Sequence, residues 1–428
     1  MKYAIVIPDG AADAPMDELS GKTPLEVAKK PHMDRIAMEG RLGTVRTTPD
    51  GYTAGSDVCT LCLLGYEPAH YHPGRAPLEA AAMGLKLAPD EWVFRCNLVT
   101  VVDGVMLDHS AGHISDREAH ALLDAVRNAL PAGLAQDATF HPGVSYRHLM
   151  TYRGLDFTGL TTTPPHDIPE QPIAAYLPKG PHADALNALM RQSALLLAGH
   201  DINIVRGQLG ENQATQLWLW GQGKAAEIPD FYARYGRHGA MITAVDLLRG
   251  IAALLGWDNL TSPGITSYHD TDYAAQGVAA CEALDKYDIV CCHVEAPDEA
   301  SHQGDVATKI ASIEAIDRHV VGPVLQKLST FNEWRILVLP DHATQCGTRK
   351  HDATPVPFAI AGNDVHNALA RPYTEKAAHG SDLHIPFGSE LMDYFLNSQL
   401  RVVERGRHKP MQAPGPSGKS TPPRSPPH

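Results

Sequence analysis

The sequence predicts an α/β protein built on a parallel sheet with helices on both of its faces. Short apolar runs of strand length recur along the chain and alternate with segments of helical periodicity. Such alternation places the strands side by side in one direction, with helices packed above and below them. With 428 residues and 43% apolar content, the chain is long enough for a large core and two domains.

The expected elements follow from the local patterns of apolar residues. Seven runs have the composition of strands: Tyr3–Ile7, Asn97–Val102, His148–Tyr152, Ile202–Val205, Leu217–Trp220, Ile289–Val294 and Ile336–Leu339. Four segments have the spacing of helices buried on one side: Ala119–Leu130, Ala183–Ala198, Ala244–Leu255 and Lys309–Lys327. The chain shows no fixed-period repeat, which argues against a solenoid or a propeller.

Charge and hydropathy exclude several classes of partner. The formal net charge of -13 argues against binding to nucleic acid, whose phosphates it would repel. No apolar segment approaches the roughly 18 residues needed to span a bilayer. Lys2 leads directly into a strand-like run, which is not the pattern of a signal peptide. We therefore expect a soluble, cytoplasmic protein without nucleic-acid or membrane partners, and nothing in the sequence indicates an oligomeric state.

Two further features, the cysteines and the C-terminal tail, indicate local structure but no catalytic or metal-binding role. The seven cysteines show no disulfide framework, and the Cys59/Cys62 pair lacks the second pair that a zinc site needs. We expect both of these cysteines on the buried face of a helix. The tail, residues 406–428, is rich in proline and has almost nothing apolar to bury, so we expect it to be disordered.

Three of the strand-like runs lead into acidic residues, and histidines follow two of these closely. The residues are Asp9, Asp298 with His302, and Asp341 with His342. The carboxyl ends of parallel strands lie at one edge of a sheet, so we expect these side chains to gather there. Clustered carboxylates repel one another unless a cation lies among them, and mixed Asp and His ligands suit Mn²⁺ or Zn²⁺ better than Ca²⁺. His351 is a further candidate ligand.

Each part of this set also has an ordinary structural interpretation. A single Asp after a strand is often a turn residue or a helix cap. Asp298 and His302, four residues apart, could form a surface pair on a helix. The whole set at one edge of one sheet favours the metal interpretation.

Ser56 is the candidate nucleophile. The stretch Gly51-Tyr-Thr-Ala-Gly-Ser-Asp places it after a flexible loop, at the start of an apolar helix. Serine is a favoured N-cap, which is the simple alternative. The same position attracts phosphate, and a metal ion would activate the hydroxyl. Together with the Asp and His set, Ser56 is predicted to carry a phosphoryl group.

These motifs resemble those of the archaeal-type, cofactor-independent phosphoglycerate mutases of the alkaline phosphatase superfamily. The resemblance runs from residue 5 to about residue 400. It is carried by Ile5-Val-Ile-Pro-Asp-Gly, Gly55-Ser-Asp, Leu64-Gly-Tyr-Glu-Pro, Gly74-Arg-Ala-Pro-Leu-Glu-Ala, Phe94-Arg-Cys-Asn-Leu-Val-Thr, Ala296-Pro-Asp-Glu-Ala-Ser-His, Leu339-Pro-Asp-His, Lys350-His and Pro355-Val-Pro-Phe. It implies an alkaline-phosphatase-like sandwich that interconverts 3-phosphoglycerate and 2-phosphoglycerate through phosphoserine at Ser56.

The resemblance also implies two divalent metal ions, usually Mn²⁺ and sometimes Mg²⁺ or Zn²⁺. One ion would be held by Asp9, Ser56, Asp341 and His342, and the other by Asp298, His302 and His351. Residues 1–71 and 226–405 would form the metal-binding domain. Residues 72–225 would form a smaller inserted α/β domain that closes over the site and excludes water, because exposed phosphoserine would hydrolyse. The candidates for binding the small phosphorylated substrate are Arg95, His113, Arg147, His166, Asp167, Arg206 and Lys350.

The sequence departs from this family in the predicted insert. Ser110-Ala-Gly-His-Ile-Ser has His113 where many archaeal-type members have arginine, which exchanges a permanent cation for one that titrates. Thr162-Thr-Pro-Pro-His-Asp-Ile and Trp218-Leu-Trp-Gly-Gln-Gly resemble a bacterial subgroup proposed to be homoserine kinases. No phosphate-binding G-x-x-x-x-G-K-[ST] loop is present for a nucleotide. The alternatives are a homoserine kinase-like phosphotransferase, a phosphomonoester or phosphonate hydrolase, and a metal-binding module without catalysis.

Overall fold

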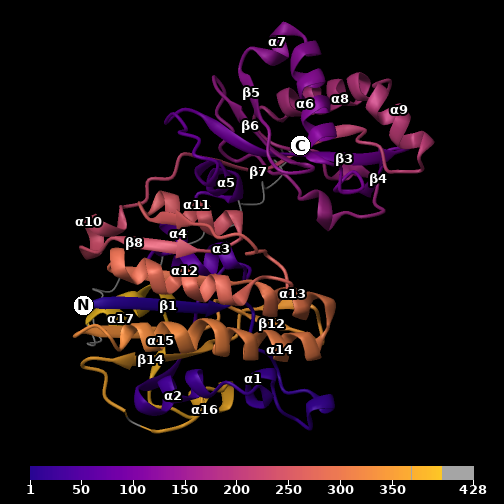
Figure 1. Ribbon diagram of the computed structural model, residues 1–428. Helices are drawn as coiled ribbons and strands as arrows, with labels where there is room; N and C mark the ends of the chain where they lie inside the picture. The colour runs from indigo at the N-terminus through magenta and orange to yellow at the C-terminus, as the bar shows by residue number, and fades with distance from the viewer. Residues whose placement is uncertain (368, 398–428) are drawn as a thin grey trace, which may run out of the picture.

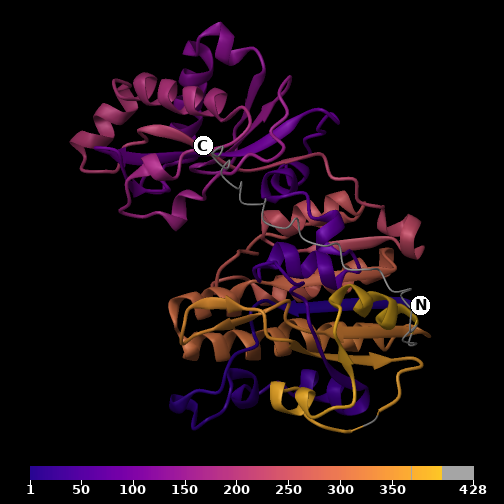
Figure 2. The same ribbon diagram turned by 180° about the vertical axis from the view of Figure 1, so that it is seen from behind.

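In the computed structural model, which describes residues 1–367 and 369–397, the chain forms two lobes with separate sheets (Figure 1). The main lobe contains an eight-stranded sheet, and the small lobe, Arg75–Lys224, contains a five-stranded sheet. Figure 2 shows from behind that the two sheets do not merge. The predicted tail, 406–428, lies outside the described residues.

The main sheet is parallel through its centre. Its spatial order is β15 (His384–Ile385), β2 (Arg41–Val45), β14 (Val356–Gly362), β11 (Trp334–Val338), β1 (Lys2–Pro8), β10 (Ile289–Val294), β8 (Gly239–Ile242) and β9 (Asp258–Leu260). The strands from β11 to β9 run parallel, whereas β14 is antiparallel to both of its neighbours. The α/β class with a parallel sheet core is therefore confirmed, with one reversed strand toward an edge.

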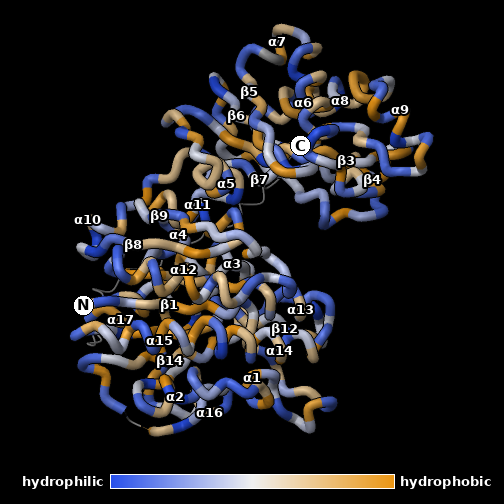
Figure 3. The backbone as a smooth tube through the Cα atoms, viewed as in Figure 1, coloured by the Kyte–Doolittle hydropathy of each residue, from blue (hydrophilic) through white to orange (hydrophobic). Residues whose placement is uncertain are grey.

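Helices bury both faces of this sheet. Tyr3, Ile5 and Ile7 of β1 pack on one side with helices α3 (Ser56–Leu63), α11 (Asp246–Leu254) and α17 (Leu391–Asn397). Ala4 and Val6 pack on the other side with α2 (Pro31–Glu39), α12 (Tyr273–Lys286), α14 (Val306–Ile316) and α15 (Gly322–Leu328). Because neighbouring strand residues face opposite sides and both sides are covered, the middle of β1 must be apolar, and residues 4–7 have hydrophobic colours in Figure 3.

Shorter elements complete the main lobe. They are α1 (Pro24–Val27), α4 (Pro68–Tyr71), α10 (Phe231–Tyr235), α13 (Ala296–Gln303), α16 (Glu375–His379) and the hairpin of β12 (Ala343–Gln345) with β13 (Lys350–Asp352). The predicted helix 309–327 contains a π-helical segment, Asp317–Val321, between α14 and α15. Asp317 there accepts hydrogen bonds from the backbone N–H groups of His32 and Met33, which anchors α2 to this segment.

The small lobe has an antiparallel sheet. Strand β3 (Trp92–Val102) lies at its centre and pairs with β4 (Val105–Asp108), β6 (Arg147–Tyr152) and β7 (Gln216–Lys224), and β5 (Ala138–His141) pairs with β6. Its core lies on the face covered by α6 (Asp116–Ala129) and α8 (Ala183–Leu197). The other helices of this lobe are α7 (Ala132–Ala135) and α9 (Asp201–Gln208).

Helix α5 (Arg75–Ala82) connects the two lobes. Its Ala76 and Ala80 pack on Val93 and Leu149 of the small sheet. Its opposite side meets α11 of the main lobe, where a Cβ at Gly250 would lie only 2.0 Å from the carbonyl oxygen of Leu78. Glycine at this position therefore allows the two helices to approach closely, and α5 packs against both lobes.

One predicted strand is wrong. Ile202–Val205 belongs to helix α9, whose N-cap is His200 with a side chain that accepts a hydrogen bond from the N–H of Ile202. Its buried residues are Asn203 and Arg206, whereas Val205 is 52% exposed. The apolar run therefore lies largely on the outside of a short helix.

The remaining sequence-based expectations concern cysteines and membrane spans. Cys59 and Cys62 are buried in α3, as predicted, and the cysteines of the chain are all free. In the described part of the chain, no helix combines the length and the hydropathy required to cross a membrane.

Candidate metal centre

The structure brings the seven predicted metal and nucleophile residues together at the carboxyl edge of the main sheet. Asp9 directly follows β1, and its backbone N–H donates to the carbonyl of Val294 at the end of the neighbouring β10. Asp341 and His342 follow β11, and α13 begins two residues after β10 ends. Parallel pairing of these three strands thus places distant parts of the sequence beside one another.

Ser56 points into this centre. Its Oγ donates to Oδ2 of Asp9 at 3.0 Å and lies 3.4 Å from Nε2 of His342. Gly55 occupies the N-cap position of α3, and no side chain caps this helix. The interpretation of Ser56 as a helix cap is therefore wrong, and its hydroxyl is available to the centre.

Asp298, His302 and His351 form the adjoining part of the cluster. Nε2 of His302 lies 3.1 Å from Oδ2 of Asp298 and 2.9 Å from Nε2 of His351. Nε2 of His351 is 3.4 Å from Oδ1 of Asp298. Asp298 as a whole residue is only 4% exposed. The ring of His351 is 4.1 Å from that of His342, centroid to centroid, which links this group to Asp9 and Ser56. Asp298 and His302 are thus not an ordinary surface pair.

The histidines are oriented as metal ligands are. Nδ1 of His302 lies 3.0 Å from the carbonyl oxygen of Arg349, and Nδ1 of His351 lies 3.0 Å from that of Ala54. A carbonyl only accepts, so each Nδ1 carries a proton and donates it, and Nε2 is the ring nitrogen that faces the cluster. Hydrogen bonding of the far ring nitrogen to a backbone carbonyl is the usual support of a metal-bound histidine.

Thr344 orients two further members of the set. Its hydroxyl donates to Oδ1 of Asp298, so the 3.1 Å contact with Nδ1 of His342 is a bond that the imidazole donates. Nδ1 of His342 therefore carries a proton, and its Nε2 faces Asp9. The fully buried Lys309 holds the backbone here, because its Nζ donates to the carbonyl of Thr344 at 2.7 Å and to Oδ2 of Asp13 at 2.8 Å.

His293 and Glu295 join the centre although the sequence analysis did not name them. Nε2 of His293 lies 2.9 Å from Oδ2 of Asp9 and 3.7 Å from Oε2 of Glu295. Both follow from the end of β10, where a single histidine interrupts the apolar run Ile-Val-Cys-Cys-His-Val. A titratable residue within a fully buried strand was the available signal, and its position level with Ile7 of β1 places it beside Asp9.

Two groups of side chains have ligand atoms close enough to share an ion. Asp9, His293 and Asp341 form one group, and Asp298, His342 and His351 form the other, with the ligand atoms of each group within 4.8 Å of one another. The family resemblance implied a different division, with His342 beside Asp9. His342 in fact lies near both groups, since its Nε2 is 3.4 Å from Oδ1 of Asp9.

The electrostatics of the centre call for added positive charge. Burial alone would raise the pKa of Asp9, but the charge of His342 and a hydrogen bond from His293 hold it well below the usual value. Burial, followed by the charge of Asp9, raises the pKa of Asp341 and that of Glu295 well above the usual range. Among the described residues, no donor satisfies Oδ1 of Asp9, Oδ2 of Asp341 or Oε2 of Glu295, although all three atoms are buried. These residues fit divalent cations.

Four of the predicted substrate residues lie along a basic and aromatic strip of the small lobe, defined by Arg95, Trp220, His166, His109, Tyr146, His113 and Arg147. The guanidinium of Arg95 stacks over Trp220 at 4.1 Å and pairs with Glu79 at 2.8 Å. His166 contacts the rings of Trp220 and His109. Tyr146 then contacts His109, His113 and Arg147. His109 and Tyr146 were not among the predicted residues.

The other three candidates differ from one another. Arg206 is 3% exposed and donates to Glu118, to the carbonyl of Asn212 and to that of Ala111. Its guanidinium is used within the small lobe, so the prediction that it binds substrate is corrected to a structural role. Asp167 lies 3.7 Å from His166, and Lys350 is exposed directly before His351.

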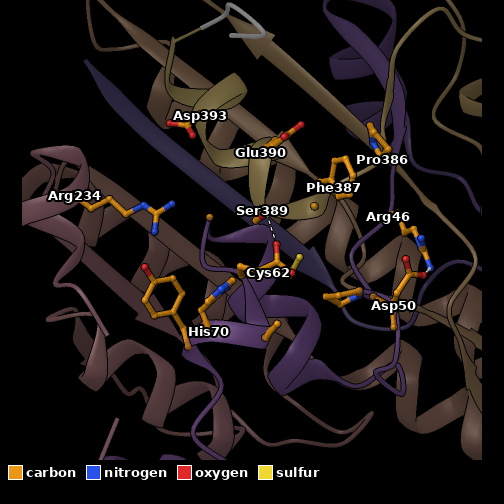
Figure 4. Close-up of a pocket in the computed structure, with 17 residues that line it drawn as sticks. Arg46, Asp50, Cys62, His70, Arg234, Pro386, Phe387, Ser389, Glu390 and Asp393 are labelled. Carbon is orange, nitrogen blue, oxygen red and sulfur yellow. Dashed lines mark hydrogen bonds and ion pairs between the residues drawn. The ribbon is translucent and has the colours of Figure 1, made fainter. Parts of the chain in front are cut away.

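A cavity of about 650 Å³ lies elsewhere in the main lobe (Figure 4). Its lining includes Cys62 near the carboxyl end of α3, together with Arg46, Asp50 and Arg234. Ser56 and the metal-ligand candidates are not among the described residues that line it. The candidate site is therefore the carboxylate and histidine centre and not this cavity.

An α/β fold with carboxylates, histidines and a serine at the carboxyl edge of its sheet has the groups that metal-dependent phosphoryl-transfer enzymes use. A family model described as 2,3-bisphosphoglycerate-independent phosphoglycerate mutase matches residues 37–203. The chain belongs to this family, because relatives with that name align over most of its length.

Two relatives and two solved structures illustrate the similarity. The 2,3-bisphosphoglycerate-independent phosphoglycerate mutase of Methanothrix thermoacetophila is 48% identical over 85% of this chain and 92% of its own. The second enzyme of that name in Methanothermobacter thermautotrophicus is 45% identical over 94% and 99%. A protein from Pyrococcus horikoshii superimposes with a TM-score of 0.78 and 27% identity over 92% and 96% of the two chains. The cofactor-independent phosphoglycerate mutase of Thermoplasma acidophilum gives 0.64 and 25% over 92% and 99%.

Proposed function

We propose that this protein interconverts 3-phosphoglycerate and 2-phosphoglycerate, without a bisphosphoglycerate cofactor, through a phosphoserine at Ser56. The observation that carries the proposal is the position of Ser56, whose Oγ lies 3.0 Å from Asp9 and 3.4 Å from His342 at the start of α3. The helix N-terminus favours a phosphoryl group there, and the family relation supports the mutase reaction.

The reaction balances without any further reactant. Oγ of Ser56 forms a bond to phosphorus as the bond between phosphorus and O3 of the glycerate breaks, and the proton lost from Oγ is matched by one gained at O3. In the second half, O2 of the same glycerate attacks the phosphoserine, loses its proton, and releases Oγ to be protonated again. The hydrogen bond to Oδ2 of Asp9 orients Oγ for the first attack.

Two bound divalent cations, which we propose to be Mn²⁺, would stabilise negative charge on the attacking and leaving oxygens. Their ligands would come from Asp9, Ser56, Asp341 and His342, with His293 added, and from Asp298, His302 and His351. His342 has two proposed places, since it lies close to both groups. The orientation of His302, His342 and His351, each with Nδ1 hydrogen-bonded and Nε2 facing the carboxylates, supports this assignment.

The remaining parts of the proposal concern the small lobe and the setting of the enzyme. We propose that 72–225 form an inserted domain that excludes water, in support of which the five-stranded sheet lies wholly between Trp92 and Lys224. Arg95, His113, Arg147 and His166 would bind the substrate, with Asp167 and Lys350 as outer contacts. We place the enzyme in the cytoplasm.

Phosphorus NMR of the Mn²⁺-loaded protein with 3-phosphoglycerate alone tests the function. We expect a 2-phosphoglycerate signal to grow in to equilibrium without release of inorganic phosphate. Inorganic phosphate as the sole product would identify a hydrolase instead. No reaction with phosphoglycerate, followed by phosphohomoserine after addition of ATP and homoserine, would replace the proposal with a kinase.

Ser56→Ala tests the covalent step. This variant lacks the oxygen that accepts the phosphoryl group, so we expect mutase turnover to fall by at least about 10⁴-fold, as in other enzymes that lose a nucleophile. The helix should remain intact, because Ser56 does not cap it. Circular dichroism and thermal unfolding provide the control. A folded Ser56→Ala protein that turns over at the normal rate would remove phosphoserine from the mechanism.

A further inference from the structure

Asp57, directly after the proposed nucleophile, accepts hydrogen bonds from a histidine and an arginine. Its Oδ2 accepts from Nε2 of His72 at 3.2 Å and from Nε of Arg75 at 3.3 Å. Asp57 is only 3% exposed, and burial alone would raise the pKa of its carboxylate. The hydrogen bond from His72 and the charge of Arg75 instead hold the pKa of Asp57 well below its usual value. An ionised carboxylate beside Ser56 thus fixes these two residues.

Arg75 extends to the backbone that precedes the nucleophile. A Cβ at Gly55 would lie 3.1 Å from Oδ1 of Asp57 and 3.8 Å from Nη2 of Arg75. The Arg75 side chain is 42% exposed. Its Nε is used by Asp57, and no described residue accepts a hydrogen bond from either terminal nitrogen. The terminal N–H groups of Arg75 are therefore available to bind a ligand near Gly55, the residue before Ser56.

His72 and Gly74 set the direction from which Arg75 arrives. Nδ1 of His72 accepts from the backbone N–H of Gly74 at 3.2 Å, so its proton lies on Nε2, where it is donated to Asp57. Gly74 has a φ of +97°, and a Cβ there would lie 3.0 Å from the carbonyl oxygen of Gln222. The chain can therefore pass β7 and begin α5 with Arg75 only because this position is glycine.

Arg75 also lies close to the cations of the small lobe. Burial lowers the pKa of Arg95, and the charge of Arg75 lowers it further. Burial likewise lowers the pKa of His166, with the charges of Arg95 and Arg75 among the additional causes. The charge of Arg75 therefore acts on Arg95 and His166 of the basic strip as well as on Asp57, the residue after Ser56.

We propose that Arg75 binds the phosphoryl group during its transfer to and from Ser56, and that Asp57 and His72 hold the guanidinium in place. The inference rests on the proposed function and adds a residue to it. A guanidinium presents paired N–H donors that match two oxygens of a phosphoryl group, and it stays protonated throughout. Arg75 is thus a catalytic residue, whereas Asp57 and His72 are positioning residues.

Three variants of the Mn²⁺-loaded protein test the role of Arg75: Arg75→Ala, Arg75→Lys and, as a matched control, Arg127→Ala. Arg127 is an exposed arginine of α6 that pairs with Asp124. We expect Arg75→Ala to lower kcat/KM by about 100-fold, in the range for loss of one donor to a developing anion. Arg75→Lys should recover only part of this loss, and the Arg127→Ala control should match wild type. Added guanidinium ion should restore part of the activity of Arg75→Ala, which a structural defect would not allow.

Binding of inorganic phosphate, measured by titration calorimetry, separates this inference from the mutase proposal. We expect Arg75→Ala to bind phosphate at least about tenfold more weakly than wild type, since one charge-assisted pair is lost. This comparison holds even if wild type fails to convert 3-phosphoglycerate, a result that would contradict only the mutase function. Equal phosphate affinities in folded wild type and Arg75→Ala would overturn the role of Arg75.

A double-mutant comparison tests the positioning role of Asp57. If Asp57 acts through Arg75, Asp57→Asn should lose activity and phosphate affinity, yet the Asp57→Asn/Arg75→Ala protein should be no worse than Arg75→Ala alone. Additive losses would show that Asp57 acts independently and would contradict its assignment.

Discussion

At the scale of single residues, the chemistry of the centre depends on which ring nitrogen of each histidine faces the carboxylates. His302, His342 and His351 each direct Nδ1 toward an acceptor outside the cluster and Nε2 toward Asp9 or Asp298. His293 makes a comparable pair of contacts, with Nδ1 3.2 Å from Thr243 and Nε2 2.9 Å from Asp9. Four imidazoles from four separate segments thus border the same candidate metal centre.

His293→Gln tests the residue that the sequence analysis did not name. The substitution removes the imidazole that lies 2.9 Å from Asp9, so we expect the affinity for Mn²⁺ to fall about 10- to 100-fold. Titration calorimetry with Mn²⁺ measures this change. His379→Gln, at an exposed position in α16, is the matched control and should bind like wild type. Unchanged Mn²⁺ affinity in His293→Gln would remove His293 from the centre.

Asp9, Asp298, Asp341 and His342 could be predicted because each comes shortly after a strand of the parallel sheet, where the topology fixes the meeting point. His293 escaped that reasoning because it lies within β10, whereas the reasoning considered only residues after a strand. Glu295 follows β10 directly but was not singled out from the acidic residues that come after this strand. Arg75 escaped for a different reason. Its role depends on contacts with Asp57, and a pairing between the first turns of two separate helices leaves no periodic signal in the sequence.

At the scale of elements, β6 contains a buried histidine that makes the small lobe sensitive to acid. His148 is 2% exposed, its Nδ1 accepts from the N–H of Gly143 at 3.0 Å, and no described residue bonds its Nε2. Burial, with a smaller contribution from the charge of His120, lowers the pKa of His148 to about 4. The folded strand therefore holds the neutral imidazole.

This depressed pKa predicts loss of stability as the pH falls. Between about pH 6.5 and 4, the unfolded chain protonates His148 and the folded chain does not, so acid favours unfolding. By pH 4, this difference in protonation lowers the free energy of unfolding by on the order of 3 kcal/mol. We expect His148→Gln, which cannot titrate, to lose correspondingly less unfolding free energy over this range in urea titrations followed by tryptophan fluorescence. Parallel pH profiles for wild type and His148→Gln would contradict the prediction.

Elements were predicted correctly where the apolar pattern was long or bounded on both sides. The run Ile289–Val294 is a strand with those bounds, and residues 183–197 form a helix as expected. Ile202–Val205 was misassigned because four apolar or amide residues are compatible with either period, and the capping contact from His200 decided for a helix. The reversal of β14 was not predictable, since strand direction depends on tertiary connections.

At the scale of the whole molecule, the proposed chemistry is divided between the lobes. The carboxylates, the metal-site histidines and Ser56 belong to the main lobe, whereas the basic and aromatic strip belongs to the small lobe (Figure 1). Helix α5 packs against both and begins with Arg75, which donates to Asp57, the residue after Ser56. In the proposed reaction, the small lobe must retain glycerate while the phosphoryl group resides on Ser56, because water would otherwise compete for it.

Arg95→Gln tests this retention. Arg95 is held by Glu79 and stacked on Trp220, and its loss would weaken the hold on an anionic substrate by the 1.5–3 kcal/mol typical of a hydrogen bond to a charged group. We expect kcat/KM for the mutase reaction to fall about 10- to 100-fold and the share of product appearing as inorganic phosphate to rise, as measured by phosphorus NMR. Arg191→Gln, an exposed position on α8 of the same lobe, should keep the wild-type product ratio. If Arg95→Gln slows the mutase without any increase in inorganic phosphate, the strip contributes to binding but not to the exclusion of water.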